Sequence, residues 1–445
     1  MLLAGCAILL PMIATAQPIK PVVEVEDTVY RYTSADNGAG PMWCYGSTCI
    51  VRCGDGVLAS GLETVLDTKP LNNCRWTLHR RDADGWKLVQ ADPKGLQREP
   101  CPVGCFADGT FLLSTNPTLN PPGTEGGGPA DPHILAFSRS RLSGPGLRKQ
   151  PVWHGEPQFT EHSYRGLGVD GPNRELVLVN NLGYEQQHWS FLDRGGKWSN
   201  CGIIHYPIRG CYSNVALKNR ACHIFSVGDV VEPVEEWRKW KREQSGREWD
   251  YVFRRLFYAY NPDIAHTQFL RPIEIENVDA TAGGLWNRDL WIDRQGDAHI
   301  IYAKTTVAIR EMRDRFFPGT SIVNSLEYCR VHDNKIVFRK TLISSPEKDP
   351  PETVGMARFH STPDGRLFIV YHAVGTDAQG KGFNENRIME MQPDGTKPIT
   401  IPLKTRLTNF MTATERGGSP PSETLDLYGN ADDPLEIRYA RVRLY

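Results

Sequence analysis

One short pattern, a tight turn followed by a buried strand, returns along most of this chain. Its clearest copy runs from Pro363 to His372, where Asp364 and Gly365 precede the apolar run Leu-Phe-Ile-Val. Asp-Gly accepts the positive φ angles of two-residue hairpins, and the apolar run is too short for a helix but suits a strand. Counting this copy there are six such units, the others near residues 54, 107, 170, 218 and 294, and weaker C-terminal strands supply a seventh.

Each unit reads as the first of two hairpins, so that one repeat holds four strands. Residues 47–60 and 75–89 show both hairpins of the first repeat. Seven repeats of four antiparallel strands predict an all-β chain folded as a seven-bladed β-propeller. The alternating segment from Glu24 to Thr33 is expected to complete the last blade and so close the ring. Charged segments at 234–246 and 305–317 predict short helical insertions in blades four and five.

The first residues predict export from the cytoplasm. Residues 2–16 are apolar and end in Ala14-Thr15-Ala16, which is typical of a signal peptide over residues 1–16, followed by a single propeller domain over 17–445. We therefore expect a secreted or periplasmic protein, with lipoprotein anchoring through Cys6 as the alternative. No later segment is long enough to span a membrane.

The cysteines fit the same compartment. Of 11 cysteines, ten remain after Cys6 is set aside, an even number that favours disulfides, with free buried thiols as the alternative. The pair Cys101 and Cys105 lacks a second pair with histidine, so the pattern does not predict a metal site. We expect no cofactor, although a structural calcium ion on a loop is compatible with the sequence.

The net charge of −1 argues against nucleic acid and anionic membranes as partners, because the chain has no overall positive field. The 41 Gly, 32 Pro and 11 Trp suit a turn-rich β protein with aromatic surfaces, as found in proteins that bind sugars. A polysaccharide or oligosaccharide is the expected partner, and the sequence leaves the oligomeric state open.

Topology predicts where a ligand would bind. If the Asp-Gly turns lie on one face, the starts of first strands and the ends of second strands meet on the opposite face, around the channel. We call this second face the ligand face. The polar residues expected there are Arg75, Arg98, Glu99, Glu161, His162, Tyr164, Arg165, Tyr212, Asn214, Asp229, Arg255, Asp289, Arg358 and His372.

The turn from Asp193 to Trp198 resembles a degenerate Asp box of the sialidase-like, or BNR-repeat, superfamily, although its Ser and Thr are absent. In layout the chain is most similar to secreted bacterial propeller polysaccharide lyases such as the ulvan lyases. This resemblance implies a secreted carbohydrate-active enzyme.

The segment Thr160 to Arg165 is the densest polar cluster and suits β-elimination from a uronate-containing polysaccharide. In this hypothesis His162 is the base and Tyr212 or Tyr164 is the acid. The carboxylate clamp is Arg75, Arg98 or Arg165.

Three alternatives stay open at this point. One is a sialidase-like glycoside hydrolase, for which the arginines and Tyr212 provide candidates. Another is a glycosidase of neutral sugars, with its carboxylate pair among Glu99, Glu161, Asp229 and Asp289. The last is a propeller that binds glycan or protein without catalysis, because a fold does not determine a function.

Overall fold

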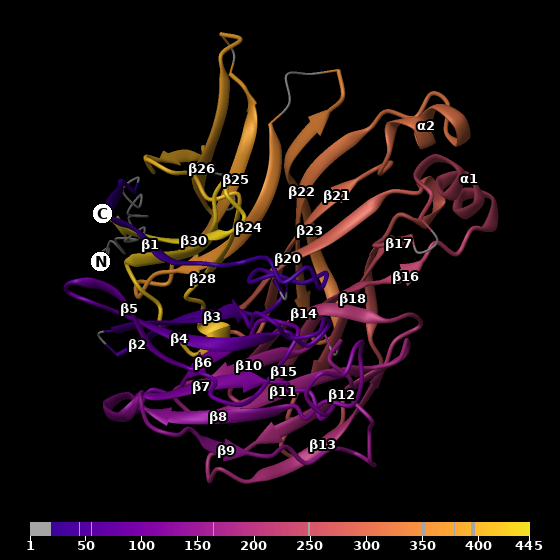
Figure 1. The fold of residues 1–445 in the computed structure, drawn as a ribbon. Coiled ribbons are helices and arrows are strands. Elements are labelled where there is room, and N and C mark those ends of the chain that lie inside the picture. Colours follow the sequence, from indigo (N-terminus) through magenta and orange to yellow (C-terminus); the bar gives the residue numbers. More distant parts are fainter. Residues whose placement is uncertain are drawn as a thin grey trace, which may run out of the picture.

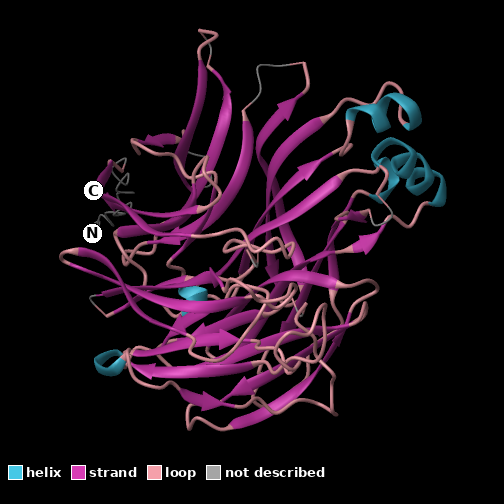
Figure 2. Cartoon of the chain, in the orientation of Figure 1, coloured by secondary structure: helices cyan, strands magenta, loops and turns pink. Residues whose placement is uncertain are grey.

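The repeated units form seven antiparallel sheets of four strands, arranged as the blades of a β-propeller (Figure 1). This computed structural model describes residues 19–43, 45–54, 56–162, 164–247, 250–348, 352–377, 379–392 and 397–445. The predicted fold is confirmed, and Figure 2 shows how little of the described chain is helical. The innermost strands touch their neighbours in ring order, from β2 through β6, β10, β14, β20 and β24 to β28 and back to β2.

The first three blades follow the chain without interruption. Blade one contains β2 (Ile50–Cys53), β3 (Gly56–Thr64), β4 (Cys74–Asp82) and β5 (Gly85–Ala91). Blade two contains β6 (Val103–Cys105), β7 (Thr110–Thr115), β8 (His133–Ser138) and β9 (Leu147–Lys149), with a 3-10 turn at Arg139–Arg141. Blade three contains β10 (Gly166–Asp170), β11 (Glu175–Leu182), β12 (Gln186–Leu192) and β13 (Trp198–His205).

Blades four and five carry the insertions. Blade four contains β14 (Gly210–Lys218), β15 (Ala221–Gly228), β18 (Arg255–Asn261) and β19 (Ile273–Asn277), and a small hairpin of β16 (Val230–Val231) and β17 (Tyr251–Val252) flanks α1 (Glu235–Ser245). Blade five contains β20 (Gly284–Ile292), β21 (Ala298–Thr305), β22 (Val323–His332) and β23 (Lys335–Pro346), with α2 (Arg310–Phe316) between its second and third strands. A 3-10 turn at Asp279–Thr281 joins the two blades.

The last two blades complete the ring. Blade six contains β24 (Thr353–Ser361), β25 (Leu367–Thr376), β26 (Gly382–Glu390) and β27 (Ile399–Ile401). Blade seven contains β28 (Asn409–Thr412), a 3-10 turn at Glu415–Gly417, β29 (Thr424–Asn430), β30 (Glu436–Leu444) and β1 (Pro21–Arg31). β1 pairs with β30 along its whole length, so the N-terminal strand closes the last blade as predicted.

Both helical insertions are confirmed, and both rise where a second strand ends. They pack against each other through aromatic rings, with centroids 5.4 Å apart for Trp237 and Phe317 and 5.6 Å apart for Trp240 and Phe316 (Figure 1). The two helices therefore form one raised edge on the ligand face, above blades four and five.

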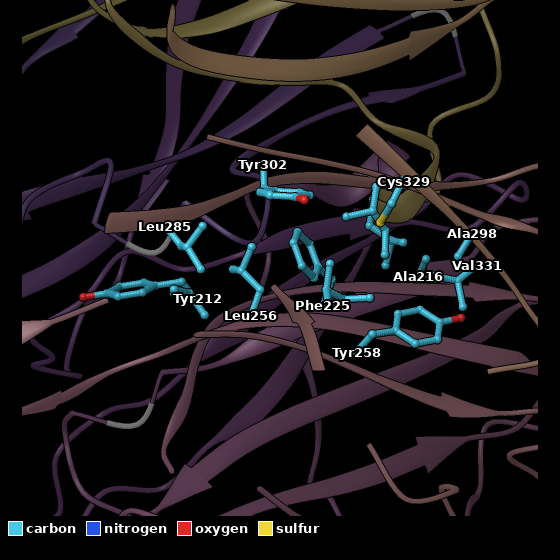
Figure 3. Packing of buried hydrophobic residues seen from close by; sticks show 14 of the residues in the cluster. Tyr212, Ala216, Phe225, Leu256, Tyr258, Leu285, Ala298, Tyr302, Cys329 and Val331 are labelled. Carbon is cyan, nitrogen blue, oxygen red and sulfur yellow. The ribbon is translucent and has the colours of Figure 1, made fainter. Parts of the chain in front are cut away.

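The core lies between the blades, because the inner strands of the sheets are buried on both faces. Figure 3 shows the junction of blades four and five, where Phe225, Leu256 and Leu285 pack together. Such two-sided burial explains why the strands read as nearly continuous apolar runs rather than as a strict alternation.

The prediction of disulfides is wrong for the described cysteines, and its alternative of free thiols holds. All nine of them are free, and only Cys201 is not fully buried. The cysteines of the third sequence cluster lie on three different strands: Cys201 is on the outer strand of blade three, Cys211 on the inner strand of blade four and Cys222 on the next strand. Cys6 and Cys44, like the predicted signal peptide 1–16, lie outside the described residues.

Within the part of the chain that the structure describes, no helix is long and apolar enough to cross a membrane.

Candidate functional site

The channel is closed near its middle by chain segments that enter from both ends. The Gly46 carbonyl accepts hydrogen bonds from Asn214 Nδ2 at 3.0 Å and from Arg416 Nη1 at 3.1 Å. A Cβ added to Gly46 would lie 1.9 Å from the Tyr212 carbonyl oxygen, so only glycine fits at this point. The ligand face therefore has a floor made by the segment around Gly46 and does not open into a through-channel.

A continuous chain of polar contacts crosses this floor between blades two and four. His162 Nε2 lies 2.7 Å from Tyr164 Oη, which donates to Asp229 Oδ2 at 3.0 Å. Asp229 Oδ2 also accepts from Arg209 Nη2 at 2.7 Å. At the other end, His162 Nδ1 lies 3.1 Å from Glu99 Oε1 and also contacts Arg98 Nη1. We call these six residues the His162 relay.

His162 is the accessible member of the relay. Its side chain is 27% exposed, whereas that of Glu99 is 1% exposed and that of Asp229 is 2% exposed. A ligand on this face would therefore meet His162 and the half-buried Arg98 first, with the two carboxylates behind them.

The protonation of Tyr164 decides which tautomer His162 adopts. Burial raises the pKa of Tyr164 well above its usual value, and the nearby Cys211 and Asp229 raise it further. The hydroxyl therefore keeps its proton and donates it to Asp229, so His162 carries hydrogen on Nε2 and donates to Tyr164. This leaves Nδ1 as the atom that gains and loses a proton. Arg98 is the donor that bonds the unprotonated Nδ1, and Glu99 is the acceptor that bonds the protonated one.

Aromatic rings form the wall beside His162. Tyr45 stacks on Tyr212 with centroids 4.8 Å apart, and Tyr212 meets Tyr164 edge-on at 5.0 Å. The ring centroid of Trp43 lies 6.5 Å from that of His162 and 6.1 Å from that of Tyr212. These rings link His162 to Tyr212, although the two residues come from different blades.

Tyr212 and Tyr164 both have left-handed backbones, with φ of 50° and 43°. Tyr212 lies in a β-bulge, because the pairing of β14 with β15 shifts between Cys211 and Asn214. Burial raises the pKa of Tyr212, so its hydroxyl stays protonated. Among the described residues its Oη has no hydrogen-bond partner, and Figure 3 shows it pointing away from the apolar cluster. Such strained residues are common at functional sites, where a bulge re-aims a side chain.

Arg209 is held by tyrosines on three sides. Its guanidinium carbon lies 5.1 Å from the ring centre of Tyr164, 4.6 Å from that of Tyr184 and 5.4 Å from that of Tyr251. This packing fixes the cation that pairs with Asp229, and so supports the orientation of the whole relay.

Six of the predicted site residues are thus brought together: Arg98, Glu99, His162, Tyr164, Tyr212 and Asp229. Three others are used inside the protein. Arg165 donates to the carbonyls of Ser114 and Pro100, Arg358 to those of Tyr45, Arg288 and Phe410, and Asp289 pairs with Arg416 at 2.6 Å. Their location at strand starts is as expected, but their polar atoms form hydrogen bonds and ion pairs with other residues of the protein.

The remaining five predicted residues bond other partners outside the relay. The pairs are Arg75 with Glu63, Arg255 with Glu274, His372 with Asn384, Glu161 with the Gly128 amide, and Asn214 with the Gly46 carbonyl.

Sequence reasoning missed Arg209 and the aromatic residues Trp43, Tyr45, Tyr184 and Tyr251. Arg209 directly precedes the first strand of blade four. The expectation that residues at the starts of first strands lie on the ligand face, here called the strand-start rule, selected Tyr212 and would have selected Arg209 too. Trp43, Tyr45 and Tyr184 lie in loops, and Tyr251 lies in the short inserted strand β17, so none of the four carries a repeat signal.

Cavities also lie in other parts of the molecule. A cavity of about 370 Å³, lined by Phe106, Trp291 and Pro420 among others, lies near the Asp-Gly turns at the other end of the channel. In the described ranges no group of three or more His, Cys, Asp or Glu side chains is placed to hold a metal ion.

Comparison with known proteins supports the fold. No protein-family model and no curated protein matches the chain. Among solved structures, the polysaccharide lyase Uly1 is 12% identical, with a TM-score of 0.52, and the alignment covers 95% of this chain and 93% of Uly1. At this identity the likeness shows a shared propeller fold.

Two further solved structures align with the chain at lower TM-scores. A protein of unknown function from Dyadobacter fermentans is 11% identical over 96% of this chain and 99% of its own, with a TM-score of 0.46. An alpha-L-arabinanase from Penicillium chrysogenum is 10% identical over 95% and 98%, with a TM-score of 0.41.

Proposed function

We propose that this protein is a carbohydrate-active enzyme that cleaves an acidic saccharide by β-elimination, with His162 as the base. The observation that carries the proposal is the position of His162 Nδ1 between the cation Arg98 and the carboxylate Glu99, while Nε2 is fixed through Tyr164 to Asp229. This arrangement stabilises the histidine both before and after it takes a proton.

Arg98 is the proposed carboxylate clamp. Its Nε donates to the Asn37 carbonyl and its Nη1 contacts His162, while Nη2 has no hydrogen-bond partner among the described residues. A uronate carboxylate that binds this guanidinium draws Arg98 away from His162 and frees Nδ1. The bound cation also stabilises the negative charge that develops on the carboxylate as the adjacent C–H bond breaks.

The reaction then balances with two side chains. His162 Nδ1 takes the proton α to the carboxylate, and the electrons of that C–H bond form a carbon–carbon double bond. The bond to the glycosidic oxygen breaks with its electron pair on oxygen, and Tyr212 Oη supplies the proton. Tyr212 suits this role because burial keeps it protonated and its hydroxyl has no partner among the described residues.

We also propose that the protein is exported, on the signal-peptide pattern of residues 1–16, and that it acts without a cofactor. A glycoside hydrolase is less favoured, because Glu99 and Asp229, the carboxylates of the relay, are both buried and bonded to neighbouring side chains.

The test is to incubate the protein with uronate-containing polysaccharides and to follow the absorbance of the unsaturated product. A rise that is lost in His162→Ala and kept in His266→Ala supports the proposal, since His266 is an exposed histidine paired with Asp263. New reducing ends without that absorbance would show hydrolysis. Binding to a glycan array without any product would show a non-catalytic propeller.

A further inference from the structure

A second cavity opens on the ligand face, between blades five and six. Its volume is about 220 Å³, and Trp286, Arg288, Lys304, Ser325 and Glu352 are among its lining residues. These residues lie at or near the starts of β20, β22 and β24 and the end of β21, the strand ends that point away from the Asp-Gly turns. The volume is below the range of about 300–1,000 Å³ for pockets that bind drug-sized ligands. It therefore suits one sugar unit rather than a chain.

A β-bulge directs Arg288 into this cavity. The pairing of β20 with β21 passes from Asn287 opposite Tyr302 to Asp289 opposite Ile301, so Arg288 has no partner residue on β21. The inner strands on either side, β14 and β24, also bulge in the half nearest the ligand face. A bulge re-aims a side chain without ending the strand, and such bulges are frequent beside functional sites.

The guanidinium of Arg288 makes no hydrogen bond or ion pair with any residue that the structure describes, and its Nε is fully enclosed. Burial lowers the pKa of Arg288, as expected for a cation removed from water without a counter-charge. Two neighbouring buried arginines differ: Arg416 pairs with Asp289, and Arg358 donates to three carbonyls. The side chain of Arg288 is half-buried, and a partly desolvated cation without a counter-charge among the described residues is costly, so an anion that enters this cavity gains a strong partner.

The other charged groups of the cavity are already paired. Lys304 Nζ lies 3.2 Å from a carboxylate oxygen of Glu276. Glu352 pairs with Arg387 at 3.1 Å and accepts from Tyr371 Oη at 3.0 Å. Among the described residues, the charge of the cavity that lacks a partner is therefore the positive charge of Arg288.

We propose that this cavity binds one acidic monosaccharide unit, with Arg288 gripping its carboxylate or sulfate group and Trp286 packing against its ring. A guanidinium offers two parallel donors to either anion, and an indole suits the apolar face of a pyranose. Tyr45 lies between this cavity and the His162 relay, because its ring stacks on Tyr212 and its hydroxyl donates to Asn287 Oδ1 at 3.4 Å, next to Arg288 in the chain. That the unit belongs to the substrate of His162 rests on the proposed function, whereas anion binding at Arg288 does not.

The experiment measures binding by calorimetry in the full chain carrying Arg98→Gln, so that the other proposed carboxylate clamp is absent. The probes are glucuronate, glucose 6-sulfate and neutral glucose. We expect at least one acidic sugar to bind and glucose to bind about tenfold more weakly or worse, as for the loss of a charged hydrogen bond. The two acidic probes distinguish a carboxylate ligand from a sulfate ligand.

Adding Arg288→Gln should weaken the binding of the acidic sugar by about tenfold or more, and Arg288→Lys should weaken this binding less. The matched control is Arg310→Gln, an exposed arginine of α2 on the same face, which should leave binding unchanged. Equal binding of glucose and both acidic sugars, or binding that survives Arg288→Gln, would overturn the inference.

Two further measurements distinguish a loss of anion binding from an effect on folding and from the proposed function. Arg288→Gln should unfold at the same urea concentration as the parent or at a higher one, since it removes a half-buried charge that has no partner among the described residues. Anion binding at Arg288 in a protein that shows no β-elimination would leave this inference standing and remove the proposed function. β-Elimination by the parent protein, together with no acidic-sugar binding in the Arg98→Gln chain, would support the proposed function and overturn this inference.

Discussion

Tyr164→Phe should destabilise the protein, because the Tyr164 hydroxyl donates to a carboxylate that has little access to water. It donates to Asp229 Oδ2 at 3.0 Å and accepts from His162 Nε2 at 2.7 Å. Without it, the buried carboxylate keeps Arg209 as a donor but loses one hydrogen bond. The expected fall in the free energy of unfolding is about 1–3 kcal/mol, the usual range for a buried polar group left without its partner.

The matched control is Tyr212→Phe. Its ring belongs to the same aromatic group, but its hydroxyl has no hydrogen-bond partner among the described residues, so the expected change is within about 0.5 kcal/mol. Urea unfolding followed by tryptophan fluorescence measures both variants, with unchanged m-values as the check that the unfolding reaction is the same. Equal losses for the two variants, or a larger loss for Tyr212→Phe, would refute the hydrogen-bond assignment of Tyr164.

The same two variants separate the roles of these hydroxyls in turnover. If β-elimination occurs, Tyr212→Phe should lower kcat by about 10²–10⁴-fold, as for the loss of a general acid. Tyr164→Phe should lower kcat less, because Tyr164 acts through His162. Full turnover in Tyr212→Phe would remove Tyr212 as the proton donor.

Three further predictions concern stability. Burial lowers the pKa of His360 to about 4, below that of the unfolded chain, so its stabilisation is complete above about pH 6.5 and is lost as the pH falls toward 4. In the parent protein the free energy of unfolding should fall between pH 6.5 and pH 4, and in His360→Gln this fall should be smaller by at most about 3 kcal/mol. An unchanged pH dependence would contradict the assignment of His360 as a buried neutral histidine. Gly46→Ala should lower the urea midpoint strongly because its Cβ meets the Tyr212 carbonyl, whereas a Cβ at Gly40 meets nothing within 4 Å, so Gly40→Ala should not. Deletion of residues 19–31 should lower the midpoint because it removes the outer strand of blade seven, and an unchanged midpoint would show that β1 does not hold the ring closed.

Part of the site could be predicted because it is local. His162 and Tyr164 are two residues apart in a polar segment at the start of a blade, and the structure confirms that their side chains meet. Tyr212 and Asp229 were selected because one follows the start of a first strand and the other follows the end of a second strand. The strand-start rule gave the correct face of the ring for all of these.

The same rule could not tell which of the polar groups on that face remain available to a ligand. Arg358 and Arg98 both satisfy it, but Arg358 is buried against three carbonyls while Arg98 reaches His162 from the neighbouring blade. Arg288 satisfies it as well, and only the bulge between Asn287 and Asp289 directs its side chain into a cavity.

The sequence by itself determined the ring of seven blades, its closure by the first strand and the face away from the Asp-Gly turns. These follow from turn chemistry and strand periodicity, which act over a few residues and recur in every repeat. Only the tertiary structure decided that residues of blades two, three and four form one relay and that Arg288 lacks a counter-charge within the described part of the chain. Such contacts depend on packing between blades and on one-residue bulges, which turn a side chain to the other side of a sheet without leaving a mark in the repeat pattern.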